Sequence, residues 1–284
     1  MAKAPKKPAK PKAAPKPKAP KPRVQAGPPD LSSVRARIDA LDAKLLKLID
    51  ERAAMARDVI AAKGEDRGLP IRTDRESAVL RGLLRQPRSA AGARLIVTIW
   101  RELMGENLAL QDPALHLAVW GGRDPAHVGE LARIRFGAAF PMDPMATPED
   151  ALSAARRRSG IAVLALDHGH NWWGKLLAEP RLKVFAALPD LSTDGPLSAL
   201  AVGDIDIEPT GSDETFWVTD SARNDIALED ALSQLGFAAR PIASGGGLKL
   251  FGLAGYVQRN DERLARAPGG LSGVIGAAPQ PFDL

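Results

Sequence analysis

One apolar stripe along residues 31–63 constrains the fold of this chain more than any other feature of its sequence. Its members recur at alternating steps of three and four residues, at Leu31, Val34, Ile38, Leu41, Leu45, Leu48, Met55 and Val59. This spacing places them on one face of an amphipathic helix of about nine turns. Residues 28–30 predict the start of the helix, with Asp30 as N-cap, and Gly64 predicts its end. Because such a helix is longer than is usual in globular proteins, we expect it to pack against a partner helix or another chain.

One charged residue interrupts the stripe. Arg52 stands between Leu48 and Met55, where an unpaired charge would be costly to bury. Lys63 lies about 20° around the helix from Arg52 and ~16 Å along it, so the two cations could bracket a small dianion. Arg35 lies roughly 25 Å away in the other direction, so it could reach the same ligand only from an antiparallel partner. The alternative is that Arg52 extends to solvent and that Arg35 and Lys63 are ordinary surface charges.

Two shorter helices are predicted after this one. The second helix opens at Thr73 and is closed by Pro87, and the third begins near Ser89 and is closed by Pro113. Both carry apolar residues at helical spacing. The three helices together predict an all-α domain over residues 30–112.

Three polar residues of these helices admit two interpretations each. Thr73 and Glu76 have the spacing of a capping box, which would give Glu76 a purely structural role. Asn107 and Gln111 lie one helical turn apart on the inward side of the third helix, and are either satisfied core groups or ligand donors. The sequence alone leaves both alternatives open.

The net charge of +5 divides unevenly along the chain. Residues 1–29 hold eight lysines, Arg23 and no acidic residue, whereas the rest of the chain has 30 basic and 34 acidic residues. The first segment also holds nine of the 24 prolines and almost no large apolar side chain, so we expect a disordered tail. It could tether polyanions, but a solubilising role is the simpler interpretation, and a nucleic-acid partner is not expected.

Composition excludes several classes of protein. With no cysteine, the chain has no disulfide, thiolate nucleophile or cysteine-held metal. Its longest apolar run, residues 161–166, is too short to span a membrane. No apolar segment follows the basic start as a signal peptide requires, so we expect a cytoplasmic protein. His168 and His170 lack a third ligand, and no metal site is expected.

The helical residues, taken in order, resemble the all-helical chorismate mutase family, in the form that is fused to prephenate dehydratase. The matching stretches are residues 34–42, 45–49, 52, 63, 70–71, 74–76, 99–104 and 108–111. The resemblance implies a three-helix domain that forms an intertwined homodimer. It also implies the rearrangement of chorismate to prephenate, a pericyclic reaction that needs no nucleophile, metal or cofactor.

The resemblance assigns roles to seven residues. Arg52 and Arg35, the latter from the partner chain, would hold the two carboxylates of chorismate. Lys63 and Gln111 would donate to the ether oxygen, and as a neutral amide Gln111 can donate at any pH.

The remaining assigned roles concern the hydroxyl side of the substrate. By the same resemblance Glu76 would accept a hydrogen bond from the substrate hydroxyl, and Arg75 would support the site electrostatically. Asn107 would bind substrate where the family usually has a small hydroxyl residue.

Residues 113–284 are predicted to form an α/β region. The predicted strands are residues 116–120, 161–166, 182–188, 215–219, 238–243 and 248–257, and the predicted helices are residues 126–136, 148–158 and 226–235. Residues 117–121, 127–137, 148–150, 161–163 and 214–218 are similar to landmarks of a prephenate dehydratase domain.

The dehydratase resemblance is degenerate. Glu214 and Thr215 stand where that family carries its motif threonine and arginine. The span between the landmarks is too short for a second lobe, and residues 225–256 suggest a small regulatory amino-acid-binding fold. We therefore expect a region without dehydratase activity that binds an aromatic amino acid effector, stabilises the dimer or binds a partner enzyme.

Three functions remain possible from the sequence. The first is a dimeric chorismate mutase of phenylalanine and tyrosine biosynthesis with a non-catalytic α/β region. The second is a bifunctional chorismate mutase/prephenate dehydratase. The third is a helical scaffold or binding protein with a basic tail, which the placement of Arg52 in an apolar stripe disfavours.

Overall fold

The computed structural model describes Met1, residues 30–63 and residues 68–283. The side chains of Ile60, Ala62 and Lys63 are not among the described groups. The predicted tail therefore lies outside the described residues, and so does the predicted end of the first helix at Gly64. The chain divides into two compact units, residues 1–48 and residues 49–284.

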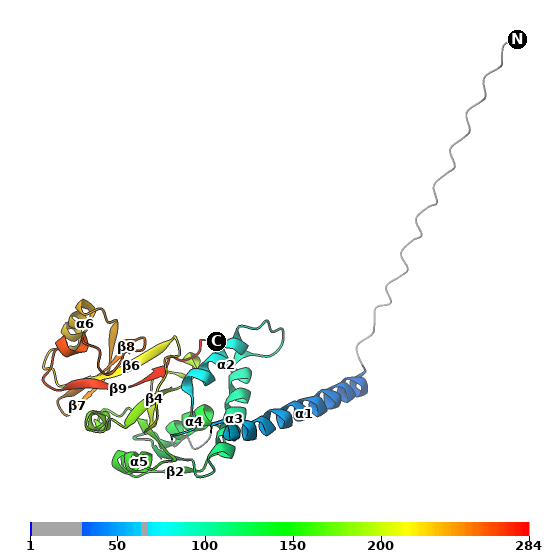
Figure 1. Ribbon diagram of the computed structural model, residues 1–284, viewed down its shortest axis with the longest axis horizontal. Helices are drawn as coiled ribbons and strands as arrows, with labels where there is room; N and C mark the ends of the chain where they lie inside the picture. Colours follow the sequence, from blue (N-terminus) through cyan, green and yellow to red (C-terminus); the bar gives the residue numbers. More distant parts are fainter. Residues whose placement is uncertain (2–29, 64–67, 284) are drawn as a thin grey trace. The chain divides into compact units, whose positions relative to one another are not determined.

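The predicted long helix is present as one continuous helix, α1 (Leu31–Lys63, 33 residues; Figure 1). Asp30 caps it, because its carboxylate accepts from the Ser33 amide at 3.2 Å and its carbonyl accepts from the Val34 amide at 3.0 Å. The Ser32 hydroxyl and the Ser33 amide donate to the Asp30 carboxylate and lower its pKa below the ordinary value.

The other two predicted helices are α2 (Thr73–Leu84) and α3 (Ala93–Gln111). The predicted capping box on α2 is wrong, because Thr73 is already helical and the N-cap, Arg72, makes no side-chain capping bond. Glu76 instead forms buried ion pairs with Arg101 and Arg135. The helical region is followed by an α/β region, which confirms the predicted order of fold classes.

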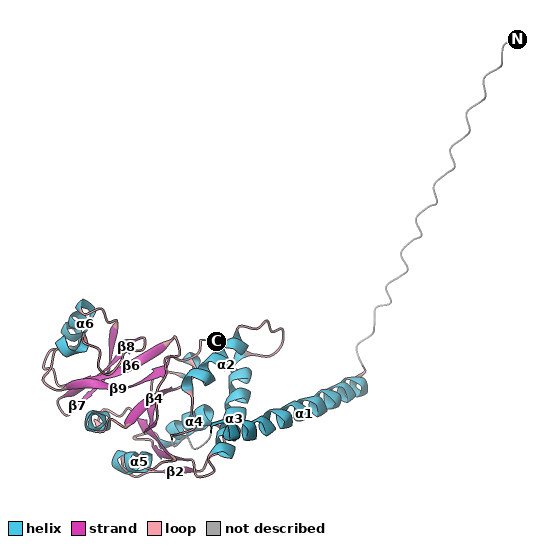
Figure 2. Cartoon of the chain, viewed as in Figure 1, coloured by secondary structure: helices cyan, strands magenta, loops and turns pink. Residues whose placement is uncertain are grey.

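Within residues 113–283 nine strands form one mixed sheet in the order β2-β1-β3-β5-β4-β9-β6-β8-β7 (Figure 2). The first half of this region comprises β1 (His116–Trp120), α4 (Pro125–Phe136), β2 (Met142–Pro144), α5 (Pro148–Ala155), β3 (Gly160–Ala165), β4 (Leu182–Leu188) and β5 (Ala199–Asp204). The second half comprises β6 (Asp213–Thr219), α6 (Asp225–Gln234), β7 (Ala239–Gly245), β8 (Leu248–Ala254) and β9 (Ser272–Pro279).

The three described α-helices of the α/β region begin at N-cap residues of types that the sequence identifies as helix starts. Asp124, Thr147 and Asn224 each accept a hydrogen bond from the backbone amide three residues further on, at 3.0, 3.1 and 2.8 Å. Pro125 and Pro148 occupy the first helical position of α4 and α5, where a missing amide hydrogen costs nothing. Local capping chemistry therefore explains why these predicted helices agree closely with the observed ones.

The two halves of the sheet have different topologies. In the first half β2, β1 and β3 run parallel, and β5 runs antiparallel to both β3 and β4. In the second half β9-β6-β8-β7 is antiparallel. A ferredoxin-like unit has two crossover helices, whereas in this half α6 is the one described α-helix and a short 3-10 turn precedes β9. A separate apolar cluster that includes Trp217, Leu228 and Phe251 fills this second half.

A close backbone approach joins the two halves. β4 pairs with β9 in parallel at Val184 and Gly276. Gly276 has a φ of +147°, and a Cβ there would lie 2.1 Å from the Val184 carbonyl oxygen. Only glycine can occupy this position without displacing β4.

The helices α2 and α3 pack against the α/β region. Leu80 and Val97 share a buried apolar cluster with Leu191 and Phe282. Arg81 of α2 donates to the carbonyls of residues 210 and 212 at 3.0 and 3.1 Å. No described helix is long and apolar enough to cross a bilayer.

Candidate active site

A cavity of about 390 Å³ lies between the end of α1, the segment before α2, and the helices α2 and α3. Its lining comprises Val59, Pro70, Arg72, Asp74, Arg75, Glu76, Met104, Asn107, Leu108 and Gln111. The structure thus brings four of the seven sequence-predicted site residues, Arg75, Glu76, Asn107 and Gln111, to one hollow.

The two arginines of the cavity differ in their partners. Arg72 donates to both oxygens of Asp74, at 3.1 and 3.0 Å. Burial raises the pKa of Asp74, but the hydrogen bonds and charge of Arg72 outweigh it and leave that pKa below its ordinary value. Arg75 is exposed and makes no ion pair with the described residues. Among the described residues that line the cavity, Arg75 is therefore a cation that is available to a carboxylate.

The amides of α3 supply neutral donors on the opposite wall. Gln111 Nε2 donates to the backbone carbonyl of Asn107 at 3.1 Å, and both residues are half-buried. A helical separation of four residues places the two side chains one above the other on the same face. The wall can therefore donate hydrogen bonds without carrying a charge.

Glu76 is the most constrained residue of the cavity. One carboxylate oxygen, Oε2, lies 2.7 Å from Nη1 of Arg101 and 2.9 Å from Nη2 of Arg135. Asp190 closes the cluster, with Oδ2 at 2.6 Å from Nη2 of Arg101 and Oδ1 at 3.6 Å from Nε of Arg135. Two buried guanidinium groups therefore compete for the oxygen with any substrate hydroxyl.

The cluster of Glu76, Arg101, Arg135 and Asp190 is electrically neutral. Burial and the neighbouring Arg135 lower the pKa of Arg101. Burial acts in the same sense on Arg135, but attraction by Glu76 and Asp190 outweighs it and raises that pKa. Both arginines remain charged at physiological pH.

Arg101 was not predicted as a residue of the site, although its position in an apolar helical stripe could have indicated it. The buried residues of α3 are Val97, Arg101, Gly105 and Leu108. Arg101 thus stands in an apolar helical stripe, as Arg52 does in α1. Arg135 carries the same signal, because it continues the buried face of α4 that Val128, Leu131 and Ala132 form. Asp190 lies outside the helices and carries no comparable signal, because only the tertiary fold brings it to them.

The remaining three predicted residues are not among the described residues that line this cavity. Arg52 is half-buried and donates to the Leu103 carbonyl at 2.9 Å, and burial lowers its pKa. The side chain of Lys63 lies outside the described part of the chain. Arg35 is exposed and belongs to the unit of residues 1–48.

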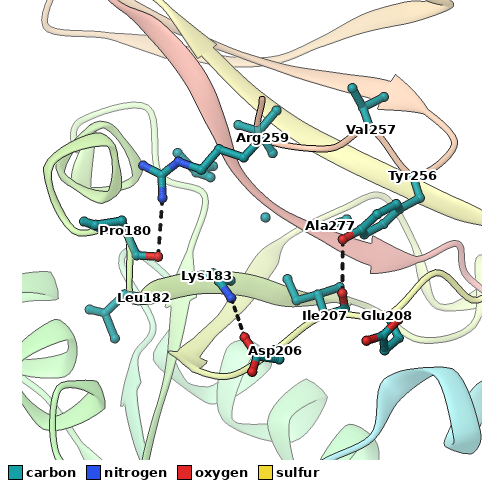
Figure 3. Close-up of a pocket in the computed structure, with 13 residues that line it drawn as sticks. Pro180, Leu182, Lys183, Asp206, Ile207, Glu208, Tyr256, Val257, Arg259 and Ala277 are labelled. Atoms are coloured by element: carbon teal, nitrogen blue, oxygen red, sulfur yellow. Dashed lines mark hydrogen bonds and ion pairs between the residues drawn. The ribbon is translucent and has the colours of Figure 1, made fainter. Parts of the chain in front are cut away.

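A second cavity, of about 470 Å³, lies between the two halves of the α/β region (Figure 3). Apolar residues of β9 and of the segments after β5 and β8 form part of its wall. Lys183 pairs with Asp206 at 2.9 Å, Arg259 donates to the Pro180 carbonyl at 3.3 Å, and the Tyr256 hydroxyl donates to the Ile207 carbonyl at 3.1 Å. The cavity therefore combines an apolar wall with groups of both charges.

Glu214 and Thr215, which stand at the two positions of the expected dehydratase motif, make hydrogen bonds within the β-sheet region. Glu214 accepts two hydrogen bonds from Arg240, both at 2.6 Å. The buried Thr215 hydroxyl donates to the Gly255 carbonyl at 2.7 Å and accepts from the Val257 amide at 2.9 Å.

Of the two histidines considered as metal ligands, His170 packs edge-on against Trp120, with ring centroids 4.8 Å apart. Among the described residues no group of three or more His, Asp or Glu is placed to hold a metal ion.

Comparison with known families decides what the helical region resembles. Residues 34–112 match the family model of chorismate mutase type II. This match spans α1, α2 and α3 almost completely and includes all seven predicted site residues. The chorismate mutase resemblance predicted from the helical residues is therefore confirmed.

Two curated relatives extend the chorismate mutase similarity. The bifunctional chorismate mutase/prephenate dehydratase of Pseudomonas aeruginosa is 34% identical over 125 residues, and that of Stutzerimonas stutzeri is 30% identical over 125 residues. Each alignment covers 42% of this chain and 34% of the relative. The chain thus spans about a third of the length of the curated relatives it matches.

Solved structures similar to this chain include two prephenate dehydratases. The enzyme from Streptococcus mutans is 14% identical, with a TM-score of 0.38, over 60% of this chain and 100% of its own. The enzyme from Arthrobacter aurescens, solved in complex with L-Phe, is 12% identical, with a TM-score of 0.40, over 58% of this chain and 92% of its own.

Proposed function

We propose that this protein is a chorismate mutase, which rearranges chorismate to prephenate. The observation that carries the proposal is the cavity at which Arg75, Asn107 and Gln111 meet within the chorismate mutase match. A pericyclic rearrangement breaks and forms its bonds in one step. The enzyme must therefore hold the dicarboxylate substrate in a folded conformer and stabilise the charge that develops on the ether oxygen.

The residues of the cavity suit these two tasks without a cofactor or metal. The resemblance gives Arg75 only electrostatic support, but because Arg75 is exposed in the cavity we propose that it supplies a cation for one carboxylate. Gln111 supplies a neutral donor for the ether oxygen, with Asn107 beside it. We further propose that Arg52 and Lys63, with Arg35 from a second chain, complete the cationic surroundings of the substrate. Glu76 supports the site through its ion pairs with Arg101 and Arg135.

The second chain is proposed from the exposed apolar surface of α1. Eight large apolar residues of this helix are 42–68% exposed, namely Leu31, Ile38, Leu41, Leu45, Leu46, Leu48, Met55 and Val59. An apolar helix face of this length is stable in water only when another surface covers it. We propose that a second copy of α1 covers it, as an antiparallel partner that also brings in Arg35.

We propose no dehydratase activity for the α/β region. Glu214 and Thr215 are engaged within the sheet and offer neither the threonine nor the arginine of the expected motif. The cavity of about 470 Å³ is instead proposed to hold an aromatic amino acid effector. Its apolar wall suits an aromatic side chain, and Arg259 and Glu208 suit a zwitterion. Residues 30–112 and 113–284 are accordingly proposed as the catalytic and regulatory domains.

One assay separates the proposed function from its alternatives. The full chain is given chorismate, then separately prephenate, and both prephenate and phenylpyruvate are followed at neutral pH, with and without phenylalanine or tyrosine. We expect prephenate from chorismate, no enzyme-dependent phenylpyruvate, and altered turnover with one of the amino acids. Phenylpyruvate formation would establish the bifunctional alternative, and absence of any turnover would leave the scaffold alternative.

A further inference from the structure

Four charges, three of them buried and the fourth, Asp190, 11% exposed, connect the active-site helices to the α/β region. Glu76 of α2 and Arg101 of α3 lie on the side of the active-site cavity, and Arg135 of α4 and Asp190 after β4 come from the α/β region. The two arginine side chains are 3% and 4% exposed. Residues beyond the mutase match are therefore in direct contact with the cavity's own side chains.

The geometry of the cluster fixes α2 relative to α3. Each carboxylate contacts both guanidinium groups, at distances of 2.6–3.6 Å. A planar guanidinium donates hydrogen bonds only along its own N–H directions, so neither helix can slide without breaking ion pairs. Removing Asp190 leaves Arg101 and Arg135 with Glu76 alone, and the two cations then compete for one carboxylate.

Glu76 and Arg101 lie on the same helices as the proposed substrate-binding residues of the cavity. Glu76 is the immediate neighbour of Arg75 on α2. Arg101 precedes Asn107 and Gln111 on the same rigid helix by about 9 and 15 Å of helical rise. A small change in the cluster therefore moves the Arg75 wall of the cavity relative to the amide wall.

We infer that Asp190 and Arg135 are positioning residues of the mutase site, so that the α/β region completes the active-site geometry of the helical domain. This inference rests on the proposed mutase function. The two residues act through Glu76 and Arg101 rather than on the substrate. A displacement of about 1 Å in a catalytic group is enough to cost a large factor in rate.

Other contacts keep the helices docked when the cluster is altered. The bonds from Arg81 do not involve the four charges. The apolar cluster of Leu80, Val97, Leu191 and Phe282 touches them at Arg101, whose guanidinium lies 6.0 Å from the centroid of the Phe282 ring, but is otherwise apolar. Loss of one charge should therefore change the orientation of α2 against α3 more than it separates them from the sheet. This difference makes a positioning role distinguishable from a purely structural one.

The test compares three variants of the full chain. Asp190→Asn removes one charge of the cluster, Asp190→Glu keeps the charge but displaces it by one methylene, and Asp194→Asn is the matched control. Asp194 lies in the same segment and pairs with the exposed Arg94 of α3. Chorismate turnover is measured as kcat and KM on protein whose folded state is checked by circular dichroism and thermal unfolding.

For both Asp190 variants we expect kcat to fall at least tenfold while KM changes less than threefold, because transition-state donors are misplaced rather than removed. The Asp194 control should retain kcat within twofold. If either folded Asp190 variant retains the parental kcat, the inference is wrong. Loss of fold by both variants would also contradict it, because the cluster would then serve folding alone. A parent chain without turnover contradicts the proposed function itself.

Discussion

At the scale of single residues, charges placed in apolar helix faces carry most of the information about this protein. Arg52 was recognisable from the sequence as a cation in the stripe of α1, but its contact with the Leu103 carbonyl was not. For Glu76 the family resemblance predicts a contact with the substrate hydroxyl, whereas its ion pairs with Arg101 and Arg135 depend on the tertiary fold. A charge pattern predicts that a partner exists, but not which residue it is.

Gln111 offers a test of the neutral donor. In Gln111→Glu, the side chain can donate only when protonated, and the ordinary pKa of a glutamic acid is about 4.3. We expect chorismate turnover that is low at pH 7.5 and rises steadily as the pH is lowered toward 5, whereas the parent shows no such rise. Gln86→Glu, on the exposed C-terminal side of α2, is the control. A variant with the parental pH profile and rate would rule out donation by Gln111.

The buried cluster also predicts a stability difference. Arg135→Met leaves two largely buried carboxylates to share Arg101, which should lower the free energy of unfolding by about 3–5 kcal/mol. Arg94→Met removes the exposed pair with Asp194 and should cost less than about 1 kcal/mol. Urea unfolding of both variants measures the difference. Equal losses would show that burial does not make the cluster more important for stability than the exposed pair.

At the scale of elements, the helices and most of the apolar strands were predictable, whereas three strands that contain proline, alanine or glycine were not. All three N-terminal helices and the strands β1 and β4 agree closely with the sequence patterns. The strands β2, β5 and β9 were missed. β2 has three residues and ends in Pro144, β5 is rich in alanine, and β9 contains Gly273 and Gly276. Such residues have low strand propensity, so the neighbouring strands must supply the stability.

The exposed stripe of α1 predicts the oligomeric state. The paired substitution Leu41→Glu and Leu45→Glu places two charges on a face whose residues are 62% and 52% exposed. We expect a dimer for the parent and a monomer, with strongly reduced mutase activity, for the variant. Light scattering after size exclusion measures the mass. Lys44→Glu, also on α1 and outside the stripe, should remain dimeric. A monomeric parent would contradict the proposed partner chain.

At the scale of the whole molecule, the residues matched by the chorismate mutase family and the compact unit of residues 49–284 have different boundaries. The chorismate mutase match ends at residue 112, whereas buried contacts continue from α2 and α3 into the α/β region. Sequence patterns are read along the chain and identify the family of a segment. They do not report that Asp190 and Phe282 return to cover helices about a hundred residues or more earlier, because this depends on how the nine strands are ordered.

The central claim is that the cavity between α2 and α3 binds and rearranges chorismate. The most direct test is kcat/KM for chorismate in Arg75→Ala, compared with Arg85→Ala, an exposed arginine at the end of the same helix. Loss of a charged hydrogen bond to a substrate carboxylate predicts a decrease of about 10- to 100-fold for Arg75→Ala. Arg85→Ala should remain within twofold of the parent. Parental kcat/KM in folded Arg75→Ala would contradict the account.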